Sequence, residues 1–381
     1  MAIRDIIYED PATRSVLELG CGEGKLLAFL APLQDDIIID RLCGIDLDPL
    51  TLQVAERTCA VTDLDRRDPR PTPLTIDLYH GSLADYHPDL AGVDCIVCTE
   101  VIEHLHPDTL ARVAPVVLGR YRPRRFIVTT PNAEYNKYFP NLKYGTSEAV
   151  FRHSDHKFEW TRAEFQQWCD GAAQRYGYTV RYSGVGSTAE STSEGIGHCS
   201  QVATFTLPSH TKAMSPSPPP PFESDTDPVV PTLHTHITYP YAAPPTDDEE
   251  LAPILIDAMT RLLRCRREDV LDDAVGPLNT LSFADLWYDW HVRRQFTCRD
   301  DFADHLARNA QWDIVVPTAN EAAGHGPAIP YHDWQVVCRA PLPNLTEAIR
   351  TGGDVPDEYQ VTNPLATAEL QYPVDENGAW L

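Results

Sequence analysis

Two carboxylates and two imidazoles are spaced in this sequence as ligands for a divalent cation. Glu100, Glu103 and His104 lie in the string TEVIEHL, and His156 follows in SDHKFEW. TEVIEHL reads as the end of a buried strand that runs into a helix, and the spacing i, i+3, i+4 predicts one shared helical face. Oxygen and nitrogen donors without a thiolate favour Mg²⁺ or Mn²⁺ and leave zinc open.

A glycine-rich turn upstream predicts the cofactor. VLELGCGEG places Gly20 and Gly22 after a predicted strand, at the carboxyl end where open α/β sheets bind ligands. Nicotinamide and flavin enzymes use a related turn, so the flanking residues matter. Glu18 can bind an ammonium group, Asp46 can accept both hydroxyls of a ribose, and Ser82 can contact an adenine edge. Together they predict S-adenosylmethionine and, with the metal site, metal-assisted methyl transfer.

The TEVIEHL motif and the histidines of SDHKFEW can also be explained without a metal. Many methyltransferases of small molecules carry Glu-x-x-Glu-His after the fourth strand, where the motif shapes the pocket or orients the substrate. His153, close to His156, fits a surface histidine equally well. Cys95 and Cys98 form a CxxC inside the apolar run VDCIVCTE, which favours core thiols over a metal or redox site.

The charge is strongly acidic and unevenly distributed. The net charge is −25; residues 1–200 carry 20 basic and 29 acidic residues, and residues 201–381 carry 11 and 27. Such a chain repels a polyanion, which argues against nucleic-acid binding. Residues 101–162 are the exception, with ten basic and six acidic side chains. This stretch is either a solvated face or a local site for a negatively charged substrate.

The sequence shows no sign of a membrane segment. MAIRDIIYED carries charges where a signal peptide needs an apolar run, and no stretch approaches about 18 apolar residues. The ten cysteines have no repeated spacing, which fits free thiols in a reducing compartment. We therefore expect a soluble protein without a membrane partner, in the cytoplasm or also the nucleus.

Strand-like and helix-like segments alternate over residues 14–206, as a doubly wound sheet requires. We expect an α/β fold, the Rossmann-like sheet of class I S-adenosylmethionine-dependent methyltransferases, over residues 1–207. The expected strands are 15–20, 42–48, 73–83, 93–100, 124–132, 179–186 and 200–207, the last two forming an antiparallel pair. The expected helices are 24–33, 49–61, 101–118 and 161–177.

The composition changes after the last of these strands. Residues 208–250 are rich in proline and acidic residues and read as an extended linker without a packed core. Residues 251–381 read as a small α+β accessory domain, with a helix at 251–265, an aromatic-rich stretch at 283–296, and strands at 312–319 and 334–342. We find no catalytic constellation in this second domain and assign it no function.

The motifs taken together resemble the HEN1 family of small-RNA 3′-terminal 2′-O-methyltransferases. The strings that carry the resemblance are VLELGCGEG, TEVIEHL, VTTPNAEYN, FRHSDHKFEWTRAEFQQWC and GVGSTAESTSEGIGHCSQVATF, in the family order over about 190 residues. The resemblance implies an enzyme that methylates the 2′-hydroxyl of the 3′-terminal nucleotide of small RNAs, protecting that end. It leaves open whether an Argonaute-family protein presents the RNA.

The resemblance also implies roles for individual residues. Glu100, Glu103, His104 and His156 would bind Mg²⁺, or Mn²⁺ as the alternative, which chelates the 2′ and 3′ hydroxyls. His104 and His156 would also be catalytic, because an imidazole near the metal can take the hydroxyl proton. Glu18, Asp46 and Ser82 would contact the cofactor beside the glycine turn. Arg152, Lys157 and Arg162 are the candidates for holding the phosphates of the last nucleotides.

The chain departs from the family in one respect. Family members usually carry a PPLxxQR-like string before the first strand, and no such string precedes Val16 here. Two other functions therefore stay open. A metal-independent small-molecule O-methyltransferase would agree better with the acidity but has no need of His156. A catalytically inactive scaffold would leave the acidic C-terminal residues to bind a protein partner.

Overall fold

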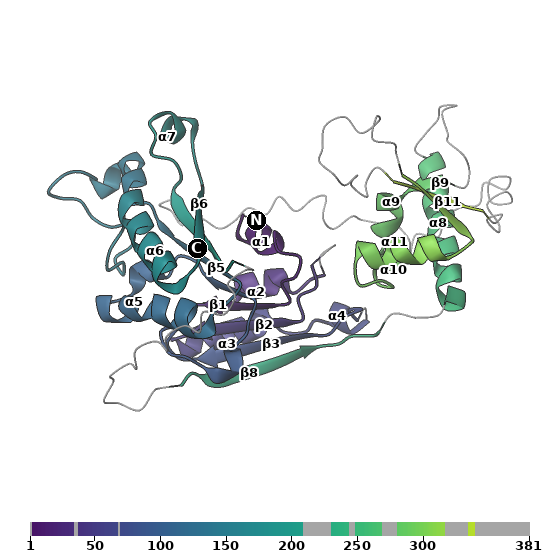
Figure 1. Ribbon diagram of the computed structural model, residues 1–381, viewed down its shortest axis with the longest axis horizontal. Helices are drawn as coiled ribbons and strands as arrows, with labels where there is room; N and C mark the ends of the chain where they lie inside the picture. The colour runs from purple at the N-terminus through teal and green to yellow at the C-terminus, as the bar shows by residue number, and fades with distance from the viewer. Residues whose placement is uncertain are drawn as a thin grey trace. The chain divides into compact units, whose positions relative to one another are not determined.

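The computed structural model describes residues 2–33, 37–67, 69–208, 230–243, 248–268, 280–316 and 334–339 (Figure 1). The chain forms two compact units. The first comprises Met1–Ala252 and Trp287–Asn309, and the second Pro253–Leu286 and Ala310–Leu381.

A mixed sheet of eight strands organises the first unit, in the order β6-β7-β5-β4-β1-β2-β3-β8. The strands are β1 (Ser15–Leu19), β2 (Arg41–Asp46), β3 (Leu74–His80), β4 (Cys95–Cys98), β5 (Arg125–Pro131), β6 (Thr179–Val185), β7 (Ser200–Thr206) and β8 (Thr232–Tyr239). The strands β1 to β5 pair in parallel, and β6, β7 and β8 pair antiparallel to their neighbours. This topology confirms the expected Rossmann-like α/β fold and the terminal antiparallel pair.

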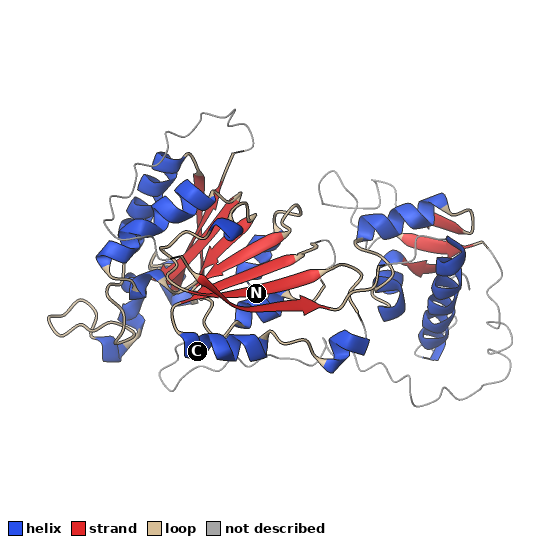
Figure 2. Cartoon of the chain, turned by 90° about the horizontal axis from the view of Figure 1, so that it is seen from below, coloured by secondary structure: helices blue, strands red, loops and turns tan. Residues whose placement is uncertain are grey.

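Helices cover both faces of this sheet (Figure 2). The helices between residues 2 and 193 are α1 (Ala2–Tyr8), α2 (Lys25–Leu30), α3 (Pro49–Thr58), α4 (Asp63–Arg67), α5 (Pro107–Ala114), α6 (Arg162–Tyr176) and α7 (Ala189–Ser193). One apolar core joins residues of α1, α2 and α3 to the sheet, and another joins residues of α5 and α6. Because both faces are covered, β1 and β4 read as nearly continuous apolar runs rather than alternating patterns. Cys95 and Cys98 are fully buried in β4, as expected for core thiols.

The predicted helix over 101–118 is wrong at its beginning. Glu100 adopts a left-handed backbone conformation with φ 52°, and only a short 3₁₀ turn, η2 (Ile102–His104), follows it. The α-helix begins at Pro107, where the fixed φ of proline suits a first helical position, and it continues as a π-helical segment, η3 (Pro115–Tyr121). Side chains from 100 to 104 are therefore not placed by helical periodicity.

The helix α6 shows how local sequence fixes an element. The Thr161 hydroxyl accepts a hydrogen bond from Glu164 N–H, and the Glu164 carboxylate accepts from Thr161 N–H, as the predicted capping box requires. Gly177 ends the helix in the left-handed conformation. Shorter 3₁₀ turns are η1 (Pro88–Leu90), η4 (Ala133–Tyr138) and η5 (Pro140–Leu142).

Part of the stretch predicted as a linker belongs to the sheet. The strand β8 pairs antiparallel with β3, and the Tyr239 hydroxyl donates to Cys59 O over 3.0 Å. The string TLHTHITY is rich in β-branched and aromatic residues, a strand signal that the neighbouring prolines obscured. Residues 209–229 and 244–247, including the PSPPPPF string, lie outside the described residues.

The remaining elements follow residue 247. They are α8 (Asp248–Glu268), α9 (Phe283–Trp287), α10 (Trp290–Arg293), α11 (Arg299–Arg308), β9 (Thr280–Ser282), β10 (Trp312–Val315) and β11 (Gln335–Cys338). A three-stranded antiparallel sheet, β10-β11-β9, lies within the second unit. The two predicted strands of this region correspond to β10 and β11, and the rest of their predicted ranges lies largely outside the described residues. Within the described part of the chain, no helix is long and apolar enough to span a membrane.

Candidate active site

The glycine turn after β1 is fastened to the end of β2. Gly20 N–H and Cys21 N–H both donate to Ile45 O, over 2.8 and 3.0 Å. Gly22 N–H donates to Asp46 Oδ2 over 2.8 Å. Gly20 and Gly22 have φ values of +72° and +51°, which side chains rarely adopt. A Cβ at Gly22 would meet no atom within 4 Å, so the turn leaves open space where a ligand can approach the backbone.

The Glu18 carboxylate is buried beneath this turn. Its exposed fraction is 5%, and its Oε2 atom has no hydrogen-bond partner among the described residues. Burial, followed by the nearby Asp46 charge, raises the pKa of Glu18 to about 8. A buried carboxylate oxygen without a partner is costly, and an ammonium group would satisfy it. Glu18 therefore fits the predicted contact to the amino group of S-adenosylmethionine.

Asp46 and Ser82 lie next to each other at the ends of β2 and β3. Gly81 N–H, which precedes Ser82, donates to the backbone oxygen of Asp46 over 2.9 Å. The Ser82 hydroxyl accepts from Ala84 N–H over 3.2 Å, and Asp46 Oδ1 accepts from Asp48 N–H over 2.9 Å. Each oxygen of Asp46 keeps capacity for another donor. Asp46 thus borders the glycine turn, and Ser82 follows in the loop next to it. Their predicted contacts to the ribose and the adenine stay predictions.

The glycine turn also contacts the loop that carries the acidic residues. A Cβ built on Gly20 would lie 2.7 Å from Val101 Cγ2, closer than real Cβ contacts allow. Only glycine therefore lets the loop between Glu100 and His104 pack against the turn. This contact places the two predicted sites side by side at the carboxyl edge of the sheet.

Two threonines at the end of β5 hold the acidic pair. The Thr129 hydroxyl donates to Glu100 Oε1 over 2.7 Å, and the Thr130 hydroxyl donates to Glu103 Oε2 over 3.0 Å. Burial raises the pKa of both glutamates, that of Glu103 to about 8 with the Glu100 charge as the second cause. Glu103 Oε1 is buried and has no hydrogen-bond partner among the described residues. Such a pair is well suited to a cation, which would stabilise both charges.

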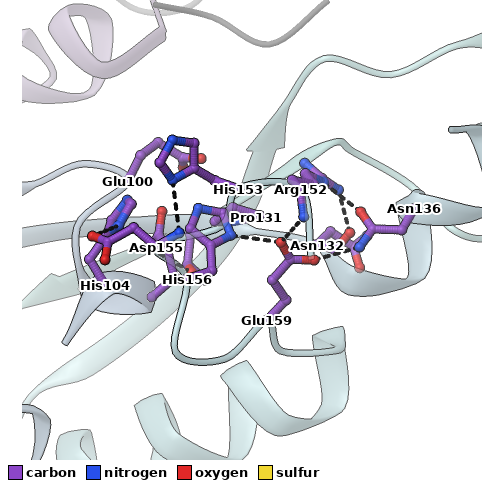
Figure 3. Close-up of polar contacts among 12 residues, drawn as sticks. Glu100, His104, Pro131, Asn132, Asn136, Arg152, His153, Asp155, His156 and Glu159 are labelled. Carbon is purple, nitrogen blue, oxygen red and sulfur yellow. Dashed lines mark hydrogen bonds and ion pairs between the residues drawn. The ribbon is translucent and has the colours of Figure 1, made fainter. Parts of the chain in front are cut away.

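Two imidazoles are oriented by carboxylates through the same ring atom. His104 Nδ1 lies 3.1 Å from Asp155 Oδ2, and His156 Nδ1 lies 2.6 Å from Glu159 Oε1 (Figure 3). The pKa of Asp155 is lowered by its hydrogen bonds with Lys157 and His104. Burial opposes ionisation of Glu159, but hydrogen bonds from His156, Arg152 N–H and Asn136 prevail and lower its pKa.

Because ionised carboxylates only accept hydrogen bonds, both Nδ1 atoms carry the proton and both Nε2 atoms keep a lone pair. Metal-binding histidines are commonly arranged in this way. Burial lowers the pKa of His104, which keeps that ring neutral as a ligand must be. The rings of His104 and His156 have centroids 4.8 Å apart.

His153 lies close to these two rings. Ring nitrogens of His104, His153 and His156 lie within 4.8 Å of one another, and neither Glu100 nor Glu103 belongs to that group. However, His153 Nδ1 accepts from Asp155 N–H over 3.2 Å, which leaves the proton on Nε2. The hydrogen bonds thus leave Nε2 of His104 and His156 as an acceptor and Nε2 of His153 as a donor. The structure brings His104 and His156 together. Of the two glutamates, Glu100 is near enough to His156 for the imidazole to oppose the rise in its pKa.

Glu159 connects His156 to a buried polar network. Its Oε1 also accepts from Arg152 N–H over 2.6 Å, and its Oε2 accepts from the Asn136 side chain. The Arg152 guanidinium donates to Asn136 Oδ1 and to the backbone oxygen of Asn132 (Figure 3). Arg152 therefore fixes the loop that carries His156.

The other two predicted phosphate contacts are also engaged within the protein. Lys157 Nζ lies 2.8 Å from Asp155 Oδ1, and Arg162 Nε lies 2.8 Å from Glu134 Oε2. These pairs, like the Arg152 network, orient loops of the site. The sequence signal, a local excess of basic residues, did not distinguish such roles from phosphate binding.

Sequence reasoning missed Thr129, Thr130, Asp155 and Glu159. All four lie in strings that it singled out, VTTPNAEYN and SDHKFEW. Local spacing does not pair them with their partners, because the hydrogen bonds of the threonines and of Asp155 span 27 to 51 residues. A metal-binding histidine usually donates its other ring N–H to a carboxylate or carbonyl oxygen, and this rule could have pointed to Asp155 and Glu159.

Comparison with known proteins identifies relatives of this chain. A family model described as a methyltransferase domain matches residues 17–121. The small RNA 2′-O-methyltransferase of Mus musculus is 38% identical over 204 residues, which are 54% of this chain and 49% of the relative. The protein of that name from Schizosaccharomyces pombe is 31% identical over 268 residues, 66% of this chain and 68% of the relative.

Among solved structures, the chain is similar to a crystal structure of the small RNA methyltransferase HEN1, with 28% sequence identity and a TM-score of 0.48. The matched region is 63% of this chain and 27% of the HEN1 chain. The chain spans about half the length of the vertebrate relatives that it matches.

Proposed function

Because this chain belongs to the small RNA 2′-O-methyltransferase family, we propose that it methylates the 2′-hydroxyl of the 3′-terminal nucleotide of small RNAs. S-adenosylmethionine is the methyl donor, and the modification protects the RNA 3′ end from tailing and trimming. The donor binds at the glycine turn, with Glu18 at its ammonium group, Asp46 at its ribose hydroxyls and Ser82 at its adenine edge.

We assign Glu100, Glu103, His104 and His156 as ligands of Mg²⁺ or Mn²⁺. The observation that carries this assignment is the pairing of both Nδ1 atoms with carboxylates, which leaves the Nε2 lone pairs of two neighbouring imidazoles available. Held by these residues, the ion would supply Lewis-acid chemistry that lowers the pKa of the 2′-hydroxyl.

The protein's own groups position the reactants and move the proton. Thr129 and Thr130 hold the two carboxylates in place, which fixes the position of the terminal ribose. The Nε2 atom of His104 or of His156, when it is not bound to the ion, would accept the proton of the 2′-hydroxyl. The carboxylate at Nδ1, Asp155 or Glu159, then stabilises the imidazolium that forms. Attack on the sulfonium methyl must be in line, so positioning makes the main contribution.

The test is methyl transfer from labelled S-adenosylmethionine to a single-stranded RNA of about 22 nucleotides, with and without Mg²⁺ or Mn²⁺. We expect labelling that needs the metal and disappears when the RNA ends in a 2′-deoxy nucleotide or a 3′-phosphate, because each removes part of the chelate. His156→Ala should abolish labelling, whereas His153→Ala, a matched loss of one imidazole, should retain most of it.

Two other outcomes would contradict the proposal. Cofactor binding without labelling of any RNA would favour a metal-independent O-methyltransferase of small molecules. Failure to bind the cofactor would favour a catalytically inactive scaffold.

The partners and location that we propose follow from this substrate. An Argonaute-family protein is the proposed carrier that presents the RNA 3′ end, and the cytoplasm, or also the nucleus, is the proposed location. Co-purification of the full chain with an Argonaute-family protein that survives nuclease treatment tests the partner.

A further inference from the structure

A loop beside the histidine cluster carries a cavity that the active site does not use. The cavity has a volume of about 390 Å³ and is lined by side chains that include Lys137, Phe139, Lys143, Tyr144 and Glu148. Two ammonium groups, two aromatic rings and one carboxylate surround a space of small-ligand size. The same loop exposes apolar side chains, with exposed fractions of 40% for Tyr144, 55% for Val150 and 47% for Phe151.

The loop is held in shape by hydrogen bonds and by the buried Leu142 side chain. Val150 N–H donates to Leu142 O over 3.0 Å and closes the loop, and the Thr146 hydroxyl donates to Lys143 O over 2.7 Å. Lys143 has a left-handed backbone conformation, with φ 49°, which few residues other than glycine adopt. A closed loop that exposes three large apolar side chains within eight residues indicates a binding surface.

The charge of this loop is opposite to that of the chain. Residues 137–153 carry three basic side chains and one acidic side chain, in a protein of net charge −25. Lys143 pairs with Glu148 over 2.5 Å, but their side chains are 54% and 70% exposed. Such an exposed pair contributes little to stability, so an incoming phosphate can replace the carboxylate.

The cavity is connected to the metal-binding residues through Arg152. The Arg152 guanidinium lies 5.4 Å from the centre of the Phe139 ring, which forms part of the cavity wall. Arg152 N–H donates to Glu159, which in turn holds His156. A strand whose last ribose lies at His156 would therefore meet this loop with its next nucleotides.

We propose that the cavity and the exposed rings bind the one to three nucleotides that precede the terminal nucleotide of a single-stranded RNA. Lys143 contacts a phosphate in place of Glu148, Lys137 contacts another in place of its partner Glu194, and Tyr144 and Phe151 stack on the bases. Amines that follow the backbone and aromatic rings that accept any base are the usual means of binding single strands without sequence preference. This inference rests on the proposed function and identifies the surface over which the RNA reaches the active site.

The experiment compares the full chain with the double variant K143Q/Y144A. The matched control L64A/R66A removes one exposed apolar and one basic side chain from α4, which precedes β3 and so lies at the opposite edge of the sheet. Binding of a 5′-fluorescein single-stranded RNA is followed by anisotropy with S-adenosylhomocysteine and Mn²⁺ present. Thermal unfolding and S-adenosylhomocysteine affinity verify that each variant is folded.

We expect K143Q/Y144A to weaken RNA binding about tenfold, as the loss of one stacked base and one phosphate contact implies, and the control to bind normally. In methyl transfer, KM for the RNA should rise about tenfold with kcat unchanged. A 4-thiouridine two or three nucleotides from the 3′ end should cross-link to the 137–153 loop.

Unchanged RNA binding by K143Q/Y144A, or cross-links only outside this loop, would overturn the inference, and the patch would then serve another partner such as a protein. Methylation of RNA by the unaltered chain would still support the proposed function in that case. If the unaltered chain binds RNA through this loop without methylating it, the proposed reaction fails and the binding site stands. If it binds no RNA, both fail.

Discussion

At the scale of single residues, the site depends on which ring atom of each histidine is already engaged. Asp155 and Glu159 occupy the Nδ1 atoms of His104 and His156, whereas a backbone N–H occupies Nδ1 of His153. Three imidazoles lie together, but their hydrogen bonds leave two of them with a free acceptor atom at Nε2 and one with a donor there. This division leads to an experiment that separates two ligand sets.

We predict that Glu159→Gln lowers Mn²⁺ affinity by about 10- to 100-fold, because the ring of His156 loses the partner that orients it. Asp155→Asn should act in the same direction and more weakly, since that carboxylate is largely exposed. Isothermal titration with Mn²⁺ measures both variants. His153→Ala serves as the comparison and should bind Mn²⁺ nearly as well as the unaltered chain. A complete loss of binding in His153→Ala would instead indicate a site of three imidazoles.

Glu18 makes the stability of the cofactor-free protein depend on pH. Its pKa rises from an ordinary 4.5 to about 8 in the folded state, chiefly through burial. Between these values the folded state binds more protons than the unfolded state, so the free energy of unfolding falls as pH rises from 4.5 to 8. We predict that Glu18→Gln reduces this decline, as measured by urea unfolding at several pH values. An identical pH profile in the variant would show that Glu18 is ionised or solvated.

At the scale of elements, the turn after β1 and the loop after β4 form one packed unit. Gly20 permits the close approach of Val101, and Thr129 and Thr130 at the end of β5 hold the acidic residues on either side of it. Three adjacent parallel strands therefore contribute to both halves of the site at their carboxyl ends. The left-handed backbone of Glu100 directs the chain out of the sheet there, an example of strain placed at a functional position.

We predict that Gly20→Ala weakens binding of both S-adenosylhomocysteine and Mn²⁺, because its Cβ would displace Val101 and the loop that carries the acidic pair. Gly22→Ala has a similar backbone cost of about 1–2 kcal/mol but no neighbour to displace, so it should affect the cofactor alone. Titration calorimetry with each ligand checks this difference. Normal Mn²⁺ binding by Gly20→Ala would mean that the two halves are independent.

At the scale of the whole molecule, the acidic charge limits how RNA can bind. The chain has a net charge of −25, and Arg152, Lys157 and Arg162 are each engaged with acidic or backbone groups. Contact with RNA should then be short and confined to the 3′ end. The same acidity should repel internal segments of a nucleic acid, so binding should require a 3′ end.

We predict a weak dependence of RNA affinity on salt. With two or three phosphates in contact, the plot of log K against log salt should have a slope of about −1.4 to −2, at roughly −0.7 per phosphate of a single strand. Anisotropy measurements from low to high KCl at constant Mn²⁺ give this slope. A slope of about −5 or steeper would require many more phosphate contacts than this loop offers.

The sequence by itself determined the elements and the chemical types in the site. Apolar runs, the capping box at Thr161 and the glycine turn are local patterns, and they predicted the sheet, α6 and the turn after β1. Local patterns suffice there because burial and backbone geometry act over a few residues. They failed at Glu100, where a left-handed backbone replaced the expected helix, and at β8, whose strand signal lies among prolines.

Only the tertiary structure decided which partners complete the site. Thr129 binds Glu100, Asp155 binds His104, and Val101 requires glycine at position 20, although these pairs are separated by 29 to 81 positions. No periodicity connects such residues, because their distances follow from strand order and from the closure of loops at one edge of the sheet. The hydrogen bonds made there, rather than residue type, separate His104 and His156 from His153.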